Sequence, residues 1–229
     1  MPTISQLVVK SRQWASQCLE KDPSYFQNLA KGQSPQYFFV GCADSRVSPL
    51  QICGLTPGEV FVHRNVANIV SGHDTSLLAS LTYAVDVLQV KHVIVKGHYC
   101  CGGVEAALRD LDVADVVDNW IQPIKAICHK HRSLLEDVKQ QSAAGQSEQR
   151  QWDLACELNA IEQAAMISVM PPVRKAWKRG QPLTVTAMVY NLAQGQLIPL
   201  SQEIAQPLDL AEFIDQSVVN VKKRWGLSR

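Results

Sequence analysis

The stretch FFVGCADSRVSP, residues 38–49, joins an apolar segment directly to a group of reactive side chains. Aromatic and β-branched residues run up to Gly41 without a polar interruption, which is typical of a strand covered on both faces. A thiol, a carboxylate and a guanidinium follow at every second position, as Cys42, Asp44 and Arg46. In open α/β sheets, functional groups gather beyond the carboxyl ends of the strands. The stretch therefore predicts a buried strand that ends in a functional turn.

Further segments share the same strand composition. They are EVFVHR (59–64), HVIVKGH (92–98), LTVTAMVYN (183–191) and QLIPL (196–200), which is expected to pair with the preceding strand across LAQG. Helical spacing of apolar residues predicts helices over residues 3–20, after Pro23, over about 74–88 and over 209–225. Strands that alternate with helices predict an α/β fold. We expect a largely parallel central sheet with an antiparallel edge strand, flanked by helices and preceded by an N-terminal helical arm.

Length and composition suit one globular domain over residues 1–229. We divide it into the helical arm (1–32), a core that carries the functional turns (33–110), and a remainder of helices and edge strands (111–229). The polar patch KQQSAAGQSEQRQ, residues 139–151, is expected to be an exposed loop or a frayed helix end.

The charge balance gives little reason to expect binding to nucleic acid or to an anionic membrane, because the net charge is only +1. No apolar run is long enough to span a bilayer. The first 22 residues lack the apolar core of a secretory signal, so we expect a cytoplasmic protein, or an organellar one if a transit segment was removed.

In an intracellular protein, the seven cysteines are expected to be free thiols or metal ligands rather than disulfides. Four of them have no partner in a motif and are interpreted as packed thiols: Cys18, Cys53, Cys128 and Cys156.

A second chemically loaded turn follows the strand at 92–98, in the stretch GHYCCGGV. His98 and Cys101 lie three residues apart there, and Cys42 would join them if the two strands are neighbours. Three nitrogen and sulfur ligands with a fourth position open are the pattern of a catalytic zinc site. Cys100 offers an alternative spacing to His98, which the pattern of residue types alone leaves open.

Several motifs in order resemble the beta-class carbonic anhydrases: CADSRV, GEVFVHRNVAN, SLTYAVDVL and GHYCCGGV. The resemblance extends from about residue 26 to 108, and returns weakly at ELNAIEQ (157–163) and at AWKRGQPLTVTAMVY (176–190). Spaced motifs in one order are harder to match by chance than a single short pattern.

The resemblance implies one Zn²⁺ per chain, held by Cys42, His98 and Cys101, with Cys100 as a neighbouring thiol that points elsewhere. It implies reversible hydration of carbon dioxide to bicarbonate and a proton, by attack of zinc-bound hydroxide. Asp44 would accept a hydrogen bond from that hydroxide, and Arg46 would hold Asp44 ionised. Without the resemblance, Asp44 and Arg46 could equally form a surface ion pair or cap a helix.

The resemblance also implies a substrate pocket at a dimer interface, in a homodimer or homotetramer. The matching positions are Gln33, Phe61, Val66, Tyr83 and Gly102. Gln33 would donate its amide to a substrate oxygen, while the next three would form apolar walls. Without the family, those three apolar residues would be interpreted as ordinary core.

One departure bears on regulation. A subgroup of the family uses a Trp, an Arg and a Tyr as a second, inhibitory bicarbonate site; Arg64 and Tyr190 match, but Phe39 stands at the Trp position. Phenylalanine has no donor, so we expect a non-allosteric enzyme.

Two other functions remain open on the sequence. One is a hydrolase of carbon disulfide or carbonyl sulfide on the same scaffold, and the other is a non-catalytic, zinc-binding structural subunit.

Overall fold

The computed structural model describes residues 3–143 and 145–227. The chain forms two compact units, Met1–Ser34 and Pro35–Arg229. The expected helical arm, residues 1–32, falls within the first unit. The interpretation of residues 1–229 as one domain stays a prediction.

The N-terminal unit contains helices α1 (Ile4–Lys21) and α2 (Tyr25–Leu29). Thr3 begins α1 through a capping box with Gln6, in which each side chain bonds the other residue's backbone N–H. None of the α1 residues is buried, and apolar side chains such as Leu7 are exposed. Its helices confirm those expected from the apolar spacing.

The second unit is built on a sheet whose described strands follow the order β2-β1-β3-β4-β5. The strands are β1 (Tyr37–Cys42), β2 (Val60–Asn65), β3 (His92–His98), β4 (Thr184–Asn191) and β5 (Gln196–Pro199). The pairs β1–β2, β1–β3 and β3–β4 are parallel, and β5 pairs with β4 in the antiparallel sense. The expected α/β fold with an antiparallel edge strand is confirmed.

The register sets the position of the functional turns. β1 lies between β2 and β3, with Gly41 opposite Arg64 on one side and Lys96 on the other. Because β1 and β3 are parallel neighbours, their carboxyl ends meet at one edge of the sheet. Cys42 and His98, the last residues of these strands, are therefore brought together.

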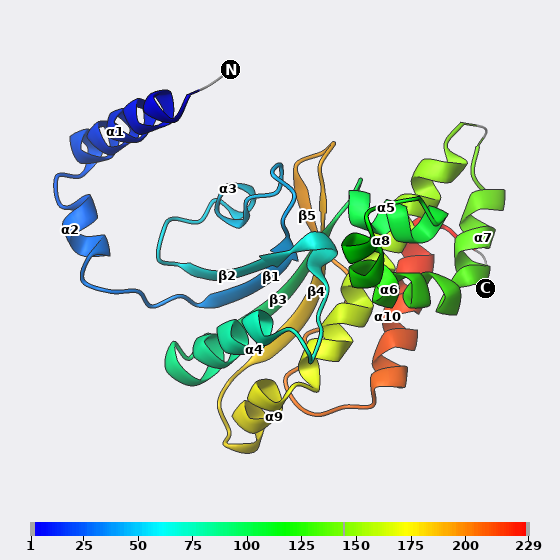
Figure 1. Ribbon diagram of the computed structural model, residues 1–229. Coiled ribbons are helices and arrows are strands. Elements are labelled where there is room, and N and C mark those ends of the chain that lie inside the picture. Colours follow the sequence, from blue (N-terminus) through cyan, green and yellow to red (C-terminus); the bar gives the residue numbers. More distant parts are fainter. Residues whose placement is uncertain (1–2, 144, 228–229) are drawn as a thin grey trace. The chain divides into compact units, whose positions relative to one another are not determined.

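Helices cover the sheet and follow its turns (Figure 1). They are α3 (Pro49–Cys53), η1 (Val66–Asn68), α4 (Thr75–Thr82), η2 (Tyr83–Val87), α5 (Gly102–Arg109), α6 (Asp115–Lys130), α7 (Arg132–Gln140), α8 (Ser147–Ser168), α9 (Pro171–Lys178) and α10 (Leu210–Trp225). α8 packs against β3 and β4, and α7 and α10 lie beside it. Most of its residues from Leu154 onward are buried.

Two segments differ in part from expectation. The helix expected over about 74–88 is an α-helix to Thr82 and a π-helical turn from Tyr83 to Val87. The patch at 139–151 is not wholly a loop, since it includes the end of α7 and the first residues of α8. Its exposed residues on helical turns, Lys139, Gln140, Glu148 and Gln149, give a pattern that polarity alone does not distinguish from a loop.

Candidate metal centre

Cys42 is the last residue of β1, and its side chain is buried. The backbone N–H groups of Asp44 and Ala67 both point at its Sγ, at 3.4 Å. Ala67 is held in the left-handed region, with φ of 61°, in the short helix η1 that follows β2. Backbone donors aimed at sulfur favour the thiolate form that a metal requires.

His98 is the last residue of β3 and is fully buried. Its Nδ1 lies 2.8 Å from the carbonyl oxygen of Tyr99. A carbonyl can only accept, so Nδ1 carries the proton and Nε2 carries the free lone pair. Nε2 is buried and has no hydrogen-bond partner among the described residues. The ring is thus held in the tautomer that leaves Nε2 available as a ligand.

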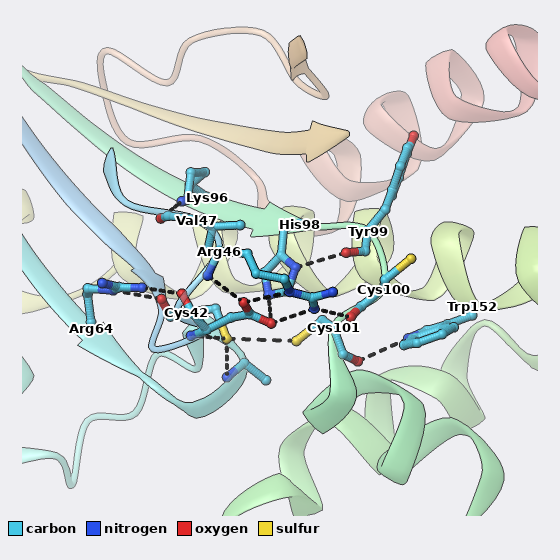
Figure 2. Close-up of polar contacts among 12 residues, drawn as sticks. Cys42, Arg46, Val47, Arg64, Lys96, His98, Tyr99, Cys100, Cys101 and Trp152 are labelled. Atoms are coloured by element: carbon cyan, nitrogen blue, oxygen red, sulfur yellow. Dashed lines mark hydrogen bonds and ion pairs between the residues drawn. The ribbon is translucent and has the colours of Figure 1, made fainter. Parts of the chain in front are cut away.

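Cys101 completes the cluster from the position just before α5. Its Sγ lies 3.9 Å from Sγ of Cys42, and the ligand atoms of Cys42, His98 and Cys101 all lie within 4.8 Å of one another. Figure 2 shows the two sulfur atoms and the imidazole converging. The two thiols and the imidazole, whose buried Nε2 has no hydrogen-bond partner among the described residues, fit Zn²⁺. Zinc takes such ligands at about 2.0–2.3 Å in a tetrahedral arrangement. The donor set therefore fits zinc.

The contact between the two cysteines changes the acidity of one thiol. The contact with Cys101 lowers the pKa of Cys42, although burial opposes this. One of the two sulfurs therefore ionises readily, and a bound metal takes both as thiolates.

Cys100 does not take part in the cluster. Its backbone is in the left-handed region, with φ of 56°, and its Sγ lies 3.5 Å from Nε2 of Gln149. Figure 2 shows its sulfur directed away from those of Cys42 and Cys101. The turn between His98 and Cys101 thus directs the second thiol of the pair to the metal position and the first away from it.

Asp44 and Arg46 form a two-point ion pair beside the cluster. Nε of Arg46 donates to Oδ1 of Asp44 at 3.0 Å, and its terminal nitrogen donates to Oδ2 at 2.7 Å. The hydrogen bonds from Arg46 hold the pKa of Asp44 well below its usual range. Oδ2 of Asp44 also lies 3.9 Å from Nε2 of His98. An ionised carboxylate oxygen therefore lies close to the free ligand nitrogen.

Arg46 also joins the two turns, since its terminal nitrogen donates to the carbonyl oxygen of Cys100 at 3.2 Å. Its side chain is 53% exposed and that of Asp44 17% exposed, so the pair lies on the open side of the cluster.

Two more basic side chains, from the neighbouring strands β2 and β3, donate hydrogen bonds to backbone carbonyls of the turn after β1. Arg64 on β2 donates to the carbonyl oxygens of Cys42 and Asp44, at 2.8 and 2.5 Å. Lys96 on β3 is fully buried and donates to the carbonyl oxygen of Val47 at 2.9 Å. Burial lowers the pKa of Lys96 to about 8. A side chain at Gly41 would lie 3.4 Å from Cε of Lys96, so the glycine leaves room for the lysine stem.

Sequence reasoning missed these supports. Lys96 gave a signal, as a charged residue within an apolar strand, but its partner lies 49 positions away. For Arg64, the sequence offers only its match to one position of a second anion site that Phe39 leaves incomplete.

Helix α8 holds the second turn and the segment after β2. Nε1 of Trp152 donates to the carbonyl oxygen of Cys101, and Nδ2 of Asn159 donates to that of Ala67, both at 3.0 Å. A Cβ on Gly103 would lie 3.0 Å from Cβ of Ala67, so this glycine permits the close approach of α5. A Cβ on Gly102 would meet nothing within 4 Å. The close approach therefore depends on Gly103.

Two of the expected pocket residues adjoin the cluster along the chain, since Val66 precedes Ala67 and Gly102 follows Cys101. The rings of Phe61 and Tyr83 are in contact, with centroids 5.8 Å apart. Val66 and Tyr83 are not ordinary core, since they are 41% and 46% exposed. Gln33 is an exposed residue of the N-terminal unit. The substrate role of these residues stays a prediction.

A histidine outside the cluster joins two helices. His131 lies between α6 and α7 with its side chain mostly buried. Its Nε2 is 2.6 Å from a carboxylate oxygen of Glu162 on α8. The break between the two helices, which the polarity did not reveal, turns this ring inward.

Comparison with known proteins bears directly on this cluster. The carbonic anhydrase family model matches residues 37–197. A carbonic anhydrase of Emericella nidulans is 35% identical over 221 residues, which cover 96% of this chain and 92% of that protein. A carbonic anhydrase of Saccharomyces cerevisiae is 33% identical, over 86% of this chain and 89% of that protein.

Solved structures agree. A beta-carbonic anhydrase from Coccomyxa, in complex with acetazolamide, superimposes with a TM-score of 0.83 and 36% identity, over 97% of this chain and 99% of that one. A tetrameric beta-carbonic anhydrase from Sordaria macrospora gives a TM-score of 0.78 at 32% identity, over 87% and 97% of the two chains.

These similarities favour neither a sulfur-substrate hydrolase nor a structural subunit. They agree with the donor set of Cys42, His98 and Cys101, whose ligand atoms all lie within 4.8 Å of one another. The chain belongs to the carbonic anhydrase family and is a beta-class member, a zinc-dependent lyase that hydrates carbon dioxide reversibly to bicarbonate.

Proposed function

We propose that Asp44 is the catalytic carboxylate of this reaction and that Arg46 is its positioning residue. When bound by Cys42, His98 and Cys101, zinc supplies the activation of water for attack on the carbon of carbon dioxide. Oδ2 of Asp44, 3.9 Å from Nε2 of His98, is within reach of a water at the open side of the cluster. Its ionised oxygen accepts a hydrogen bond from that water and so orients the lone pair used in the attack. This carboxylate position is the observation that carries the proposal.

Arg46 keeps Asp44 in the productive state. Two donors fix both carboxylate oxygens, so that the carboxylate does not rotate toward the metal position and occupy it. The same pair favours a non-allosteric enzyme, with Asp44 held by Arg46. The engagement of Arg64 with two backbone carbonyls supports this as well, because those donors are already in use.

Carbon dioxide would bind among Phe61, Val66, Tyr83 and Gly102, with Gln33 as the amide donor. An apolar pocket with one donor suits a small, uncharged, linear substrate. The contact of Phe61 with Tyr83 and the partial exposure of Val66 support this assignment.

The chain would function as a homodimer or homotetramer with its pocket at the interface. Exposed apolar residues support this, since Val66, Tyr83 and Leu7 of α1 would be covered by a second copy. The related Sordaria macrospora enzyme is tetrameric.

The cell compartment would be the cytoplasm. The seven cysteines are all free, which suits a reducing compartment. Within the described residues, no helix has both the length and the apolar character to span a bilayer. Fractionation of cells that express the chain tests the location, and recovery in an organellar fraction would contradict it.

The activity is tested by stopped-flow hydration of carbon dioxide from about pH 6.5 to about pH 9, with zinc content assayed on the same sample. We expect about one zinc per chain and fast hydration. Full zinc occupancy without hydration would contradict the proposed roles.

The shared pocket is tested by mixing two variants, Asp44→Asn and Gln33→Ala, each defective alone. If the two residues come from different chains, mixed dimers carry one undamaged site, and random mixing restores about a quarter of the parent activity. Activity that stays at the level of the separate variants would place both residues in one chain.

A further inference from the structure

A buried carboxylate is linked through Tyr99 to the histidine of the metal cluster. Glu157 on α8 is fully buried. Its Oε1 accepts from the hydroxyl of Tyr99 at 2.5 Å, and its Oε2 accepts from Arg224 and from Nε1 of Trp225, the latter at 3.0 Å. A buried carboxylate is costly unless it is paired and hydrogen-bonded, and these three donors satisfy it together.

Tyr99 connects this carboxylate to the metal cluster. Its side chain bonds Glu157, while its carbonyl oxygen accepts from Nδ1 of His98 at 2.8 Å. Its backbone N–H donates to the carbonyl oxygen of Tyr190 on β4 at 3.0 Å. Figure 2 shows the carbonyl turned to the imidazole and the ring extending away, toward the C-terminal helix. The peptide that orients His98 is thus anchored on both sides.

The donors to Glu157 come from distant parts of the chain. Arg224 and Trp225 lie in the last turn of α10, 67 and 68 positions after Glu157 in the chain. Among the described residues, Arg224 is the cation paired with this carboxylate. The end of α10 therefore supplies two of the three side-chain donors to Glu157, and the third is the hydroxyl of Tyr99.

We propose that Glu157, Arg224 and Trp225 act as positioning residues for His98 through Tyr99, so that the end of α10 sets how tightly the cluster holds zinc. The inference rests on His98 being a zinc ligand. An acceptor on the second ring nitrogen fixes the tautomer and the direction of the ligand lone pair. A displaced Tyr99 carbonyl would leave Nδ1–H poorly paired in a buried site and would let the ring rotate.

The competing interpretation is that these contacts only attach α10 to α8. In that case their loss would lower thermal stability without altering the metal environment. The two interpretations differ in the behaviour of the bound metal, so the test measures the metal directly.

Two variants of the full chain, Tyr99→Phe and Arg224→Met, are loaded with zinc and mixed with excess chelator. We expect zinc release to be about tenfold faster in Tyr99→Phe, the typical size of an effect on an outer partner of a ligand histidine. Arg224→Met is expected to shift in the same direction by severalfold, and Arg224→Lys to recover part of the loss.

The cobalt-substituted proteins supply a spectroscopic readout. Absorption of Co²⁺ bound to thiolates and imidazole depends on ligand geometry, so both variants are expected to shift these bands. Arg179→Met is the matched control, because Arg179 pairs with Asp86 at 2.7 Å and is 42% exposed, against 35% for Arg224. The control is expected to match the parent in zinc release and in the cobalt spectrum.

Parent-like zinc release and cobalt bands in both variants would overturn the inference, whatever happens to their thermal midpoints. Failure of the zinc site itself has a different signature. The parent would then hold no zinc, which would overturn the site and this inference together.

Discussion

The two turns that build the metal cluster are supported in different ways. The turn after β1 carries Cys42, Asp44 and Arg46, and it opens to solvent at Arg46. The turn after β3 carries His98 and Cys101, both buried, and it is enclosed by α8. Arg64 and Lys96 hold the first turn by its carbonyls, whereas aromatic side chains and α8 hold the second.

The difference separates reactivity from metal retention. The open turn presents an ionised carboxylate where a water and a small substrate can arrive. The enclosed turn offers only ligands, and burial there excludes water and limits ring movement. Changes in the first turn should therefore alter hydration more than zinc content, except at Cys42, which belongs to both roles.

The largest expected effect is from Cys42→Ala. Removal of one of the protein ligands should lower bound zinc to well below one per chain and reduce hydration about a thousandfold, the loss of several kcal/mol of transition-state stabilisation. Zinc analysis with stopped-flow hydration checks this. Cys53→Ala, at a half-buried thiol outside the cluster, is the control and should keep both. A Cys42→Ala protein with full zinc would show that another residue binds the metal.

Asp44→Asn should separate the two roles. The amide keeps the shape of the side chain but accepts a hydrogen bond far less well than the carboxylate, so hydration should fall about a hundredfold. Zinc content should stay at the parent level, because the ligands are untouched. Asp86→Asn breaks an aspartate–arginine contact of the same length elsewhere and should leave hydration unchanged. Loss of zinc in Asp44→Asn would contradict the separation of roles between the turns.

Arg64→Met should make the turn after β1 less rigid. It removes the donors to the carbonyls of Cys42 and Asp44, and hydrogen bonds to charged groups contribute about 1.5–3 kcal/mol. Hydration is expected to drop about tenfold, with slower zinc uptake. The test is hydration at saturating zinc. A parent-like rate would mean that the turn holds its shape without Arg64.

The smallest effect on hydration is expected from Gly103→Ala, which tests the packing of the enclosed turn. The new Cβ would meet side chains at 3.0 and 3.1 Å, so the free energy of unfolding should fall by about 1–3 kcal/mol. Gly102→Ala is the control, since its Cβ has open space and its effect on unfolding should stay below about 1 kcal/mol. Urea unfolding measures both. Equal stability of the two variants would show that α5 can move away from Ala67.

Much of the fold was predictable from local patterns. Apolar strands and amphipathic helices leave clear periodicities, and the parallel order followed from their alternation. The ligand set was predictable because Cys42, His98 and Cys101 lie at or just after strand ends and match the motifs of the family that the sequence resembles. Cys100 could be set aside only by the family resemblance, since residue spacing allowed either thiol; the left-handed backbone at Cys100 is the physical reason for the choice.

The supports of the site could not be predicted in this way. Trp152, Glu157 and Arg224 lie in helices whose sequence shows amphipathic or apolar patterns but not their partners 51 to 67 positions away. Likewise, either Gly102 or Gly103 could have been the close approach, until α5 was placed against Ala67.

The sequence by itself determined which reactive side chains follow each strand, because strand periodicity and side-chain type depend on neighbours within a few positions. Only the tertiary structure placed β1 beside β3 and so brought these side chains together. It also decided how they are held: by Arg64 and Lys96 at one turn, and by α8 with the end of α10 at the other. Such contacts depend on the orientation of whole elements, which many distant residues set together through the packing of one core.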